Sequence, residues 1–84
     1  MDKAVVDKWL QQYPKLENFI DAGTISLKMA REILDVDRWF MYDMFKELVV
    51  AGAVKACGNN SWRATPELRE YLKQIREERK QHDV

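Results

Sequence analysis

The sequence predicts a mainly helical α+β domain that contains one small β-hairpin. Apolar residues recur at spacings of three and four in several segments, which is the period of an amphipathic helix. Gly52 ends the longest of these segments, and Gly58-Asn59-Asn60 follows between two short stretches of strand-like composition. A chain of 84 residues has room for a single domain with a modest core.

The first part of the chain, residues 3–22, is expected to form an N-terminal helical segment. Apolar residues at helical spacing predict a helix over residues 3–12. Pro14 has no amide hydrogen to donate, so this helix must end or bend before it. Gly23 stops a second, shorter helix, and residues 24–25 are expected to be extended.

Residues 26–51 are expected to form two helices joined by a tight turn at residues 35–37. Ser26 is placed to cap the first helix and Asp37 the second, because each side chain can accept an amide hydrogen bond at a helix start. Gly52 ends the second helix, since glycine adopts a left-handed conformation at low cost. The expected buried stripes are Leu27, Ala30, Ile33 and Leu34 on the first helix, and Met41, Met44, Phe45 and Leu48 on the second.

Residues 53–65 are expected to form the hairpin, and residues 66–80 a C-terminal helix. Gly58-Asn59-Asn60 can close the hairpin because these residue types tolerate positive φ angles. Thr65-Pro66-Glu67 is typical of a helix start. It supplies a capping side chain, a proline in the first turn and an acidic residue near the positive end of the helix dipole.

Composition limits the kinds of site that the chain can carry. Fourteen basic and fourteen acidic residues cancel, so binding to a polyanion must come from a local patch. The single cysteine, Cys57, excludes an internal disulfide and a multi-cysteine metal cluster, and it is expected to be buried in a strand. The only histidine, His82, lies in a polar tail and is expected to be solvated.

No pattern in the sequence is typical of an enzyme or of a membrane protein. Nothing resembles a nucleophile with its base or a phosphate-binding loop, so we expect no catalysis, no metal or other cofactor and no small-molecule substrate. No apolar run approaches the roughly 18 residues of a membrane span. The first residues lack the pattern of a signal peptide, and a cytoplasmic location is expected.

The stretch from Ile25-Ser26-Leu27 to Gly52-Ala53-Val54 resembles winged helix-turn-helix domains. The Ile-Ser entry and the glycine exit into a strand are similar to the DNA-reading gamma domain of bacterial chromosome translocases. They are also similar to small winged-helix regulators of bacteria and mobile elements. The resemblance implies a recognition helix at residues 37–51 in the major groove of DNA. It also implies a wing at residues 54–65 that touches the backbone or the minor groove.

The second helix departs from the translocase pattern at the positions that read bases. Residues 39, 40, 42, 43 and 46 are expected to face outward, where base contacts are usually made. Where that pattern has asparagine and arginines at these positions, this chain has Trp39, Phe40 and Asp43. None of these makes a bidentate contact to guanine or adenine, and Asp43 repels phosphate. We therefore expect a small DNA-binding protein, a transcription regulator or accessory factor, that contacts duplex DNA through its wing and through backbone contacts. The residues expected to contact DNA are Lys28, Arg31, Arg38, Tyr42, Lys46, Lys55, Asn59, Asn60 and Arg63.

Alternative interpretations of both residue sets stay open. The basic residues are equally typical of an ordinary solvated surface. The second helix also suits a protein partner, because Trp and Tyr dominate binding hot spots. The residues of that alternative site are Trp39, Phe40, Tyr42, Asp43, Val49 and Val50. Otherwise Trp39 or Phe40 packs beneath helix 3–12, or the rings stack on unpaired bases.

A homodimer is expected to form through the C-terminal helix. Its apolar residues Leu68, Leu72 and Ile75 lie at positions i, i+4 and i+7 and therefore share one face. The alternative is that the same residues pack against helix 3–12 within a monomer.

Overall fold

The computed structural model describes residues 1–20 and 23–82, with side chains for all of these except residues 19, 20, 81 and 82. The expected end of the N-terminal helical segment at residue 22 lies outside the described residues, and so does the side chain of His82.

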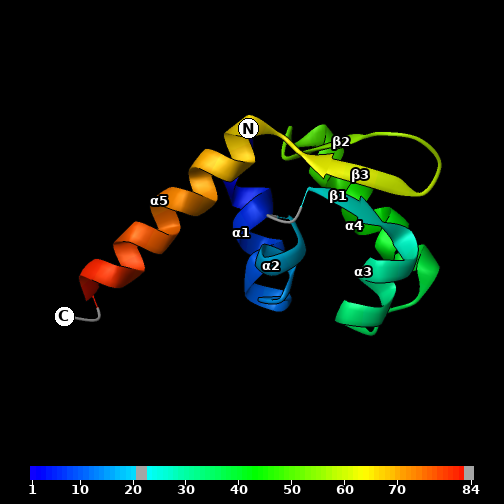
Figure 1. The fold of residues 1–84 in the computed structure, drawn as a ribbon, viewed down its shortest axis with the longest axis horizontal. Helices are drawn as coiled ribbons and strands as arrows, with labels where there is room; N and C mark the ends of the chain where they lie inside the picture. The colour runs from blue at the N-terminus through cyan, green and yellow to red at the C-terminus, as the bar shows by residue number, and fades with distance from the viewer. Residues whose placement is uncertain (21–22, 83–84) are drawn as a thin grey trace.

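The described residues form a mainly helical α+β fold, as predicted. Its helices are α1 (Lys3–Gln12), α2 (Leu16–Ile20), α3 (Leu27–Leu34), α4 (Arg38–Val50) and α5 (Pro66–His82). Its strands are β1 (Thr24–Ser26), β2 (Val54–Ala56) and β3 (Ser61–Ala64). In Figure 1, α1 and α2 lie between α5 on one side and the sheet, α3 and α4 on the other.

The sheet has three antiparallel strands in the order β1-β3-β2, so the predicted hairpin is only part of it. The extended segment expected at residues 24–25 forms the third strand, β1, which pairs with β3. Trp62 in the central strand is buried, and its ring stacks on Phe45 of α4 at a centroid distance of 4.4 Å. This contact fixes α4 across one face of the sheet.

Local signals in the sequence correctly located several helix ends. The Ser26 hydroxyl accepts a hydrogen bond from the Met29 amide at 3.1 Å, and the Asp37 carboxylate accepts one from the Phe40 amide at 2.9 Å. α1 ends at Gln12, before the proline. Thr65 accepts a hydrogen bond from the Leu68 amide at 3.3 Å, which begins α5. The predicted stripe Met41, Met44, Phe45 and Leu48 is fully buried.

Expectations about the burial of Ile33, Cys57 and the C-terminal helix were wrong. Ile33 is 37% exposed, because Leu27, Ala30 and Leu34 already fill the face of α3 that meets the core. Cys57 is exposed, because β2 ends at Ala56 and the cysteine begins the turn instead of lying within the strand.

The third expectation was the dimer surface on the C-terminal helix. Leu68 and Leu72 are buried in the core of their own chain and cannot form an exposed dimer face in this fold. Ile75 is half-buried. α5 also continues to His82, past the expected end at residue 80. None of the described helices is long and apolar enough to cross a bilayer.

Candidate nucleic-acid interface

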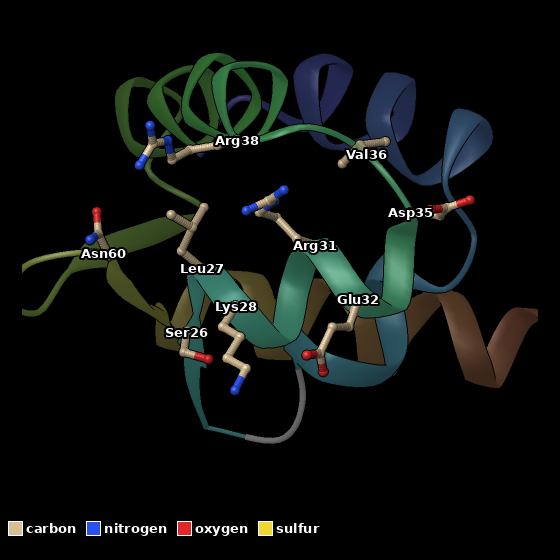
Figure 2. A pocket seen from close by; sticks show the side chains of 9 residues that line it. All are labelled: Ser26, Leu27, Lys28, Arg31, Glu32, Asp35, Val36, Arg38 and Asn60. Carbon is tan, nitrogen blue, oxygen red and sulfur yellow. The ribbon is translucent and has the colours of Figure 1, made fainter.

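An open hollow lies between α3, the turn that follows it, the start of α4 and the hairpin turn (Figure 2). Its volume is about 710 Å³. Three of the predicted basic residues meet there, together with one of the predicted asparagines. The lining residues are Ser26, Leu27, Lys28, Arg31, Glu32, Asp35, Val36, Arg38 and Asn60.

Two arginines dominate the side of this hollow that faces α4. Figure 2 shows the Arg31 side chain pointing from α3 toward α4, where Arg38 begins the opposite wall. In the same view Glu32 points away from α4, and the Asp35 carboxylate points out of the hollow. Neither arginine forms an ion pair with another described residue. Two guanidinium groups therefore face one hollow without a carboxylate between them.

The hairpin turn is held against both helices of this hollow. The Tyr42 hydroxyl on α4 donates a hydrogen bond to the side-chain oxygen of Asn60. The Leu27 amide at the start of α3 donates to the Asn60 carbonyl at 2.8 Å. Asn60 has a φ of 59°, a left-handed conformation that asparagine tolerates better than most residues. The predicted turn chemistry is confirmed, and it places the turn beside α4.

Trp39 stands out from the start of α4 and is 70% exposed, whereas Trp9 and Trp62 are 7% and 8% exposed. The Arg38 guanidinium carbon lies over the indole at 5.4 Å from the ring centroid. The Tyr42 ring lies 6.2 Å away on the next turn of the helix. The prediction that Trp39 faces outward is therefore confirmed.

Phe40, the next residue, does not face outward as predicted but is half-buried. Its ring makes edge contacts to Trp9 and Tyr13 of the N-terminal segment, each at 5.7 Å between centroids. α1 thus covers the side of α4 that carries Phe40, as one of the alternatives from the sequence anticipated. Phe40 belongs to the packing of the fold and not to an exposed site.

The exposed face of α4 is not a continuous apolar patch. Trp39, Asp43, Lys46 and Val50 follow one another at helical spacing, and all four are exposed. The charged pair in the middle separates Trp39 from Val50, which is 83% exposed, and from Val49 at 38%. Val50 lies eleven positions after Trp39, which corresponds to roughly 16 Å along the helix axis.

The exposed face of the sheet carries a second basic group. Lys55 on β2 is the register partner of Arg63 on β3, and both are exposed. Arg69 on α5 lines the same shallow depression as Arg63 and was missed by sequence reasoning. The sequence could have indicated Arg69 only by its position, because it lies one turn into a helix that begins directly after β3.

Predicted DNA-contacting residues are thus divided between two places. Lys28, Arg31, Arg38 and Asn60 meet at the hollow, with Tyr42 bonded to Asn60. Lys55 and Arg63 lie on the sheet, and Asn59 is exposed in the turn. Lys46 lies with neither group, since it lines a depression that also contains Val50 near the end of α4.

Three basic residues on α1 and α5 have carboxylate partners. Lys8 pairs with Glu47 at 2.9 Å, which ties α1 to α4. Arg76 and Arg79 pair with Glu17 at 2.9 and 3.1 Å, which ties α5 to α2. Burial alone raises the pKa of Glu17, but the hydrogen bonds and charges of the two arginines outweigh it and hold that pKa below its ordinary value of 4.5. These cations support the fold.

One tyrosine is also perturbed, far from the hollow. The Tyr71 hydroxyl on α5 donates a hydrogen bond to the Asp7 carboxylate of α1 at 2.5 Å. This bond, with burial and the nearby negative charges, raises the pKa of Tyr71 to about 12. It is a second link between the two ends of the chain.

No family model, curated protein or solved structure matches this chain.

Proposed function

We propose that the chain is a winged helix-turn-helix domain that binds duplex DNA through backbone contacts and serves as a small regulator or accessory protein. In this proposal α3 and α4 are the helix pair, and β2 and β3 are the wing. The order of the helices and strands supports the proposal, because a helix pair followed by a two-stranded ribbon is the skeleton of such domains. The wing is short and is held against α4 by the bond between Tyr42 and Asn60.

The observation that carries the proposal is the hollow with Arg31 and Arg38. Both guanidinium groups lack a carboxylate partner among the described residues, whereas Arg76 and Arg79 on α5 are paired with Glu17. Guanidinium is the side-chain group best suited to phosphate, because its planar fork matches two phosphate oxygens. Lys28 lines the same hollow and adds a third positive charge, with its side chain pointing away from α4 in Figure 2. Such contacts position a protein on DNA but carry no sequence information.

Binding of this kind is weak and depends steeply on salt. The exposed face of α4 presents Trp39 and Asp43 in place of side chains that read base edges. Each phosphate contact contributes about −0.9 to the slope of log K against log salt. With Lys28, Arg31 and Arg38 engaged, the expected slope is about −3.

The test is a fluorescence anisotropy titration of a short mixed-sequence duplex between about 50 and 200 mM salt. The double variant Arg31→Gln/Arg38→Gln is compared with Lys73→Gln/Lys80→Gln, which removes the same charge from exposed positions on α5. We expect the first variant to bind more weakly and to lose about 2 from the salt slope, and the second to match the original protein. Absence of binding at the lowest salt would rule out the proposal.

A second candidate function is a protein-binding surface on α4, favoured by the exposure of Val50. This residue lines a depression of about 290 Å³ together with Val5 and Lys46. Static light scattering over a range of concentrations measures self-association, the simplest form of such binding. If α4 is that interface, Val50→Ser and Trp39→Ser should each abolish it while the circular dichroism spectrum stays the same. Phe40 is unsuitable for this test, because it packs in the fold.

A further inference from the structure

The exposed side chain of Trp39 has no part in the packing of the fold, which suggests that it binds a ligand. A tryptophan side chain that is 70% exposed loses the stabilisation that burial gives the other two tryptophans of the chain. It does not join a larger apolar patch, because Asp43 and Lys46 follow it on the exposed face of α4. Its ring is instead in contact with Arg38, which lines the hollow that also contains Arg31.

The ring is also held in place. Arg38 lies over it at 5.4 Å, and Tyr42 lies beside it at 6.2 Å with the two planes tilted by 52°. Tyr42 is itself fixed by its bond to Asn60 in the hairpin turn. A ligand that stacks on this indole therefore meets a surface that is already ordered, and binding costs little conformational entropy.

The chemistry of indole restricts what Trp39 can recognise in DNA. It has one N–H donor and no acceptor, so it cannot form the paired hydrogen bonds that identify a base edge. What it offers is a flat face, and the faces of bases are accessible only where a base has left the stack. Asp43, one turn further along the same side of α4, would bring a carboxylate against the phosphates if the helix entered the groove deeply.

We propose that Trp39 stacks on an unpaired base, so that the protein prefers duplex DNA containing one, such as a bulge, over a continuous duplex. This inference rests on the proposed DNA binding at the hollow of Arg31 and Arg38. In this arrangement the two arginines bind the phosphates next to the bulge, and the indole of Trp39 stacks on the unpaired base. Stacking of this kind tolerates any base, so the preference is for the shape of the DNA and not for its sequence.

The experiment compares two labelled probes of the same sequence, a continuous duplex and a duplex with one extruded adenine. Anisotropy titrations at low salt use the original protein, Trp39→Ala, Trp39→Phe and Val50→Ala. The last is a matched control, since it shortens another exposed apolar side chain of α4. We expect the original protein to bind the bulged probe about 5- to 150-fold more tightly, which corresponds to about 1–3 kcal/mol at 1.4 kcal/mol per tenfold.

Trp39→Ala should remove that preference without weakening binding to the continuous duplex. Trp39→Phe should retain part of it, and Val50→Ala should retain all of it. Tryptophan emission provides an independent readout, because Trp9 and Trp62 are buried and Trp39 is not. The bulged probe should quench emission of the original protein and leave that of Trp39→Ala unchanged.

Each contrary result has its own meaning. Equal affinity of the original protein for both probes, or a preference that survives in Trp39→Ala, overturns the role of Trp39 but leaves DNA binding intact. Tighter binding to the isolated single strand than to the bulged duplex overturns the duplex requirement. Failure to bind any probe at low salt removes this inference together with the proposed function.

Discussion

The two sides of α4 differ in what covers them. On the side facing α1, Phe40 packs against Trp9 and Tyr13, and Glu47 pairs with Lys8. On the opposite side Trp39, the residue just before Phe40, is 70% exposed, with Arg38 over its ring and Tyr42 beside it. Two adjacent aromatic residues thus have separate roles. The N-terminal helix α1 covers Phe40 and leaves Trp39 exposed.

The largest effect should come from Trp9, which joins α1 to α4. Trp9→Ala removes a buried ring that contacts both Tyr13 and Phe40. We expect a loss of about 3–5 kcal/mol in the free energy of unfolding, because a cavity replaces most of the side chain. Urea denaturation followed by circular dichroism measures this. A loss below about 1 kcal/mol would mean that α1 is not a structural cover of α4.

The adjacent pair Trp39 and Phe40 provides a matched comparison. Phe40→Ala should cost about 1–3 kcal/mol, less than a fully buried phenylalanine, because the ring is half-buried. Trp39→Ala should change stability by less than about 0.5 kcal/mol, since that ring is largely exposed. Denaturant midpoints of the two variants test the comparison. Equal losses of stability in the two variants would show that the two sides of α4 do not differ in how much they contribute to the fold.

A smaller effect is expected where Tyr42 holds the hairpin turn. Tyr42→Phe removes the hydroxyl that donates to Asn60, and it should cost about 0.5–1.5 kcal/mol. Hydrogen exchange of the Leu27 amide, which donates to the Asn60 carbonyl, should become faster as the turn loosens. If hydrogen exchange of the Leu27 amide is unchanged, Tyr42 does not anchor the turn. The bond from Tyr42 to Asn60 would then not explain why the Trp39 ring is held in place.

The smallest effect concerns Glu17, the carboxylate that pairs α2 with α5. Because its pKa is lower in the folded chain than when unfolded, the ion pairs stabilise the fold above the unfolded value. That contribution is lost as the pH falls below 4.5 and through the folded pKa. Both arginines are substantially exposed, so Glu17→Gln should cost less than about 1 kcal/mol at neutral pH. The difference between the two proteins should disappear in acid; a difference that persists there would refute the ion-pair explanation.

Local signals predicted most of the fold. Ser26, Asp37 and Pro14 act on neighbouring backbone groups, and so their effects on helix ends could be deduced without tertiary information. The buried stripe of α4 followed from helical spacing in the same way. Strand β1 was anticipated only as an extended segment, because its pairing with β3 joins residues far apart in sequence.

The candidate site was harder to predict for the same reason. Helical spacing shows which residues share a face but not which element covers that face. Phe40 was placed outside because nothing local reveals that α1 lies over it. Leu68 and Leu72 were assigned to a dimer because their partners within the core come from distant segments. Arg69 approaches Arg63 only through the geometry at the end of β3.

The links between the two ends of the chain have a consequence for how the protein is made. Tyr71 and Asp7 are 64 residues apart, and Arg76 and Glu17 are 59 apart. During translation, α1 and α2 leave the ribosome before α5, and these contacts can form only once α5 has been synthesised. Until then the N-terminal helices lack the contacts with α5 that complete the fold.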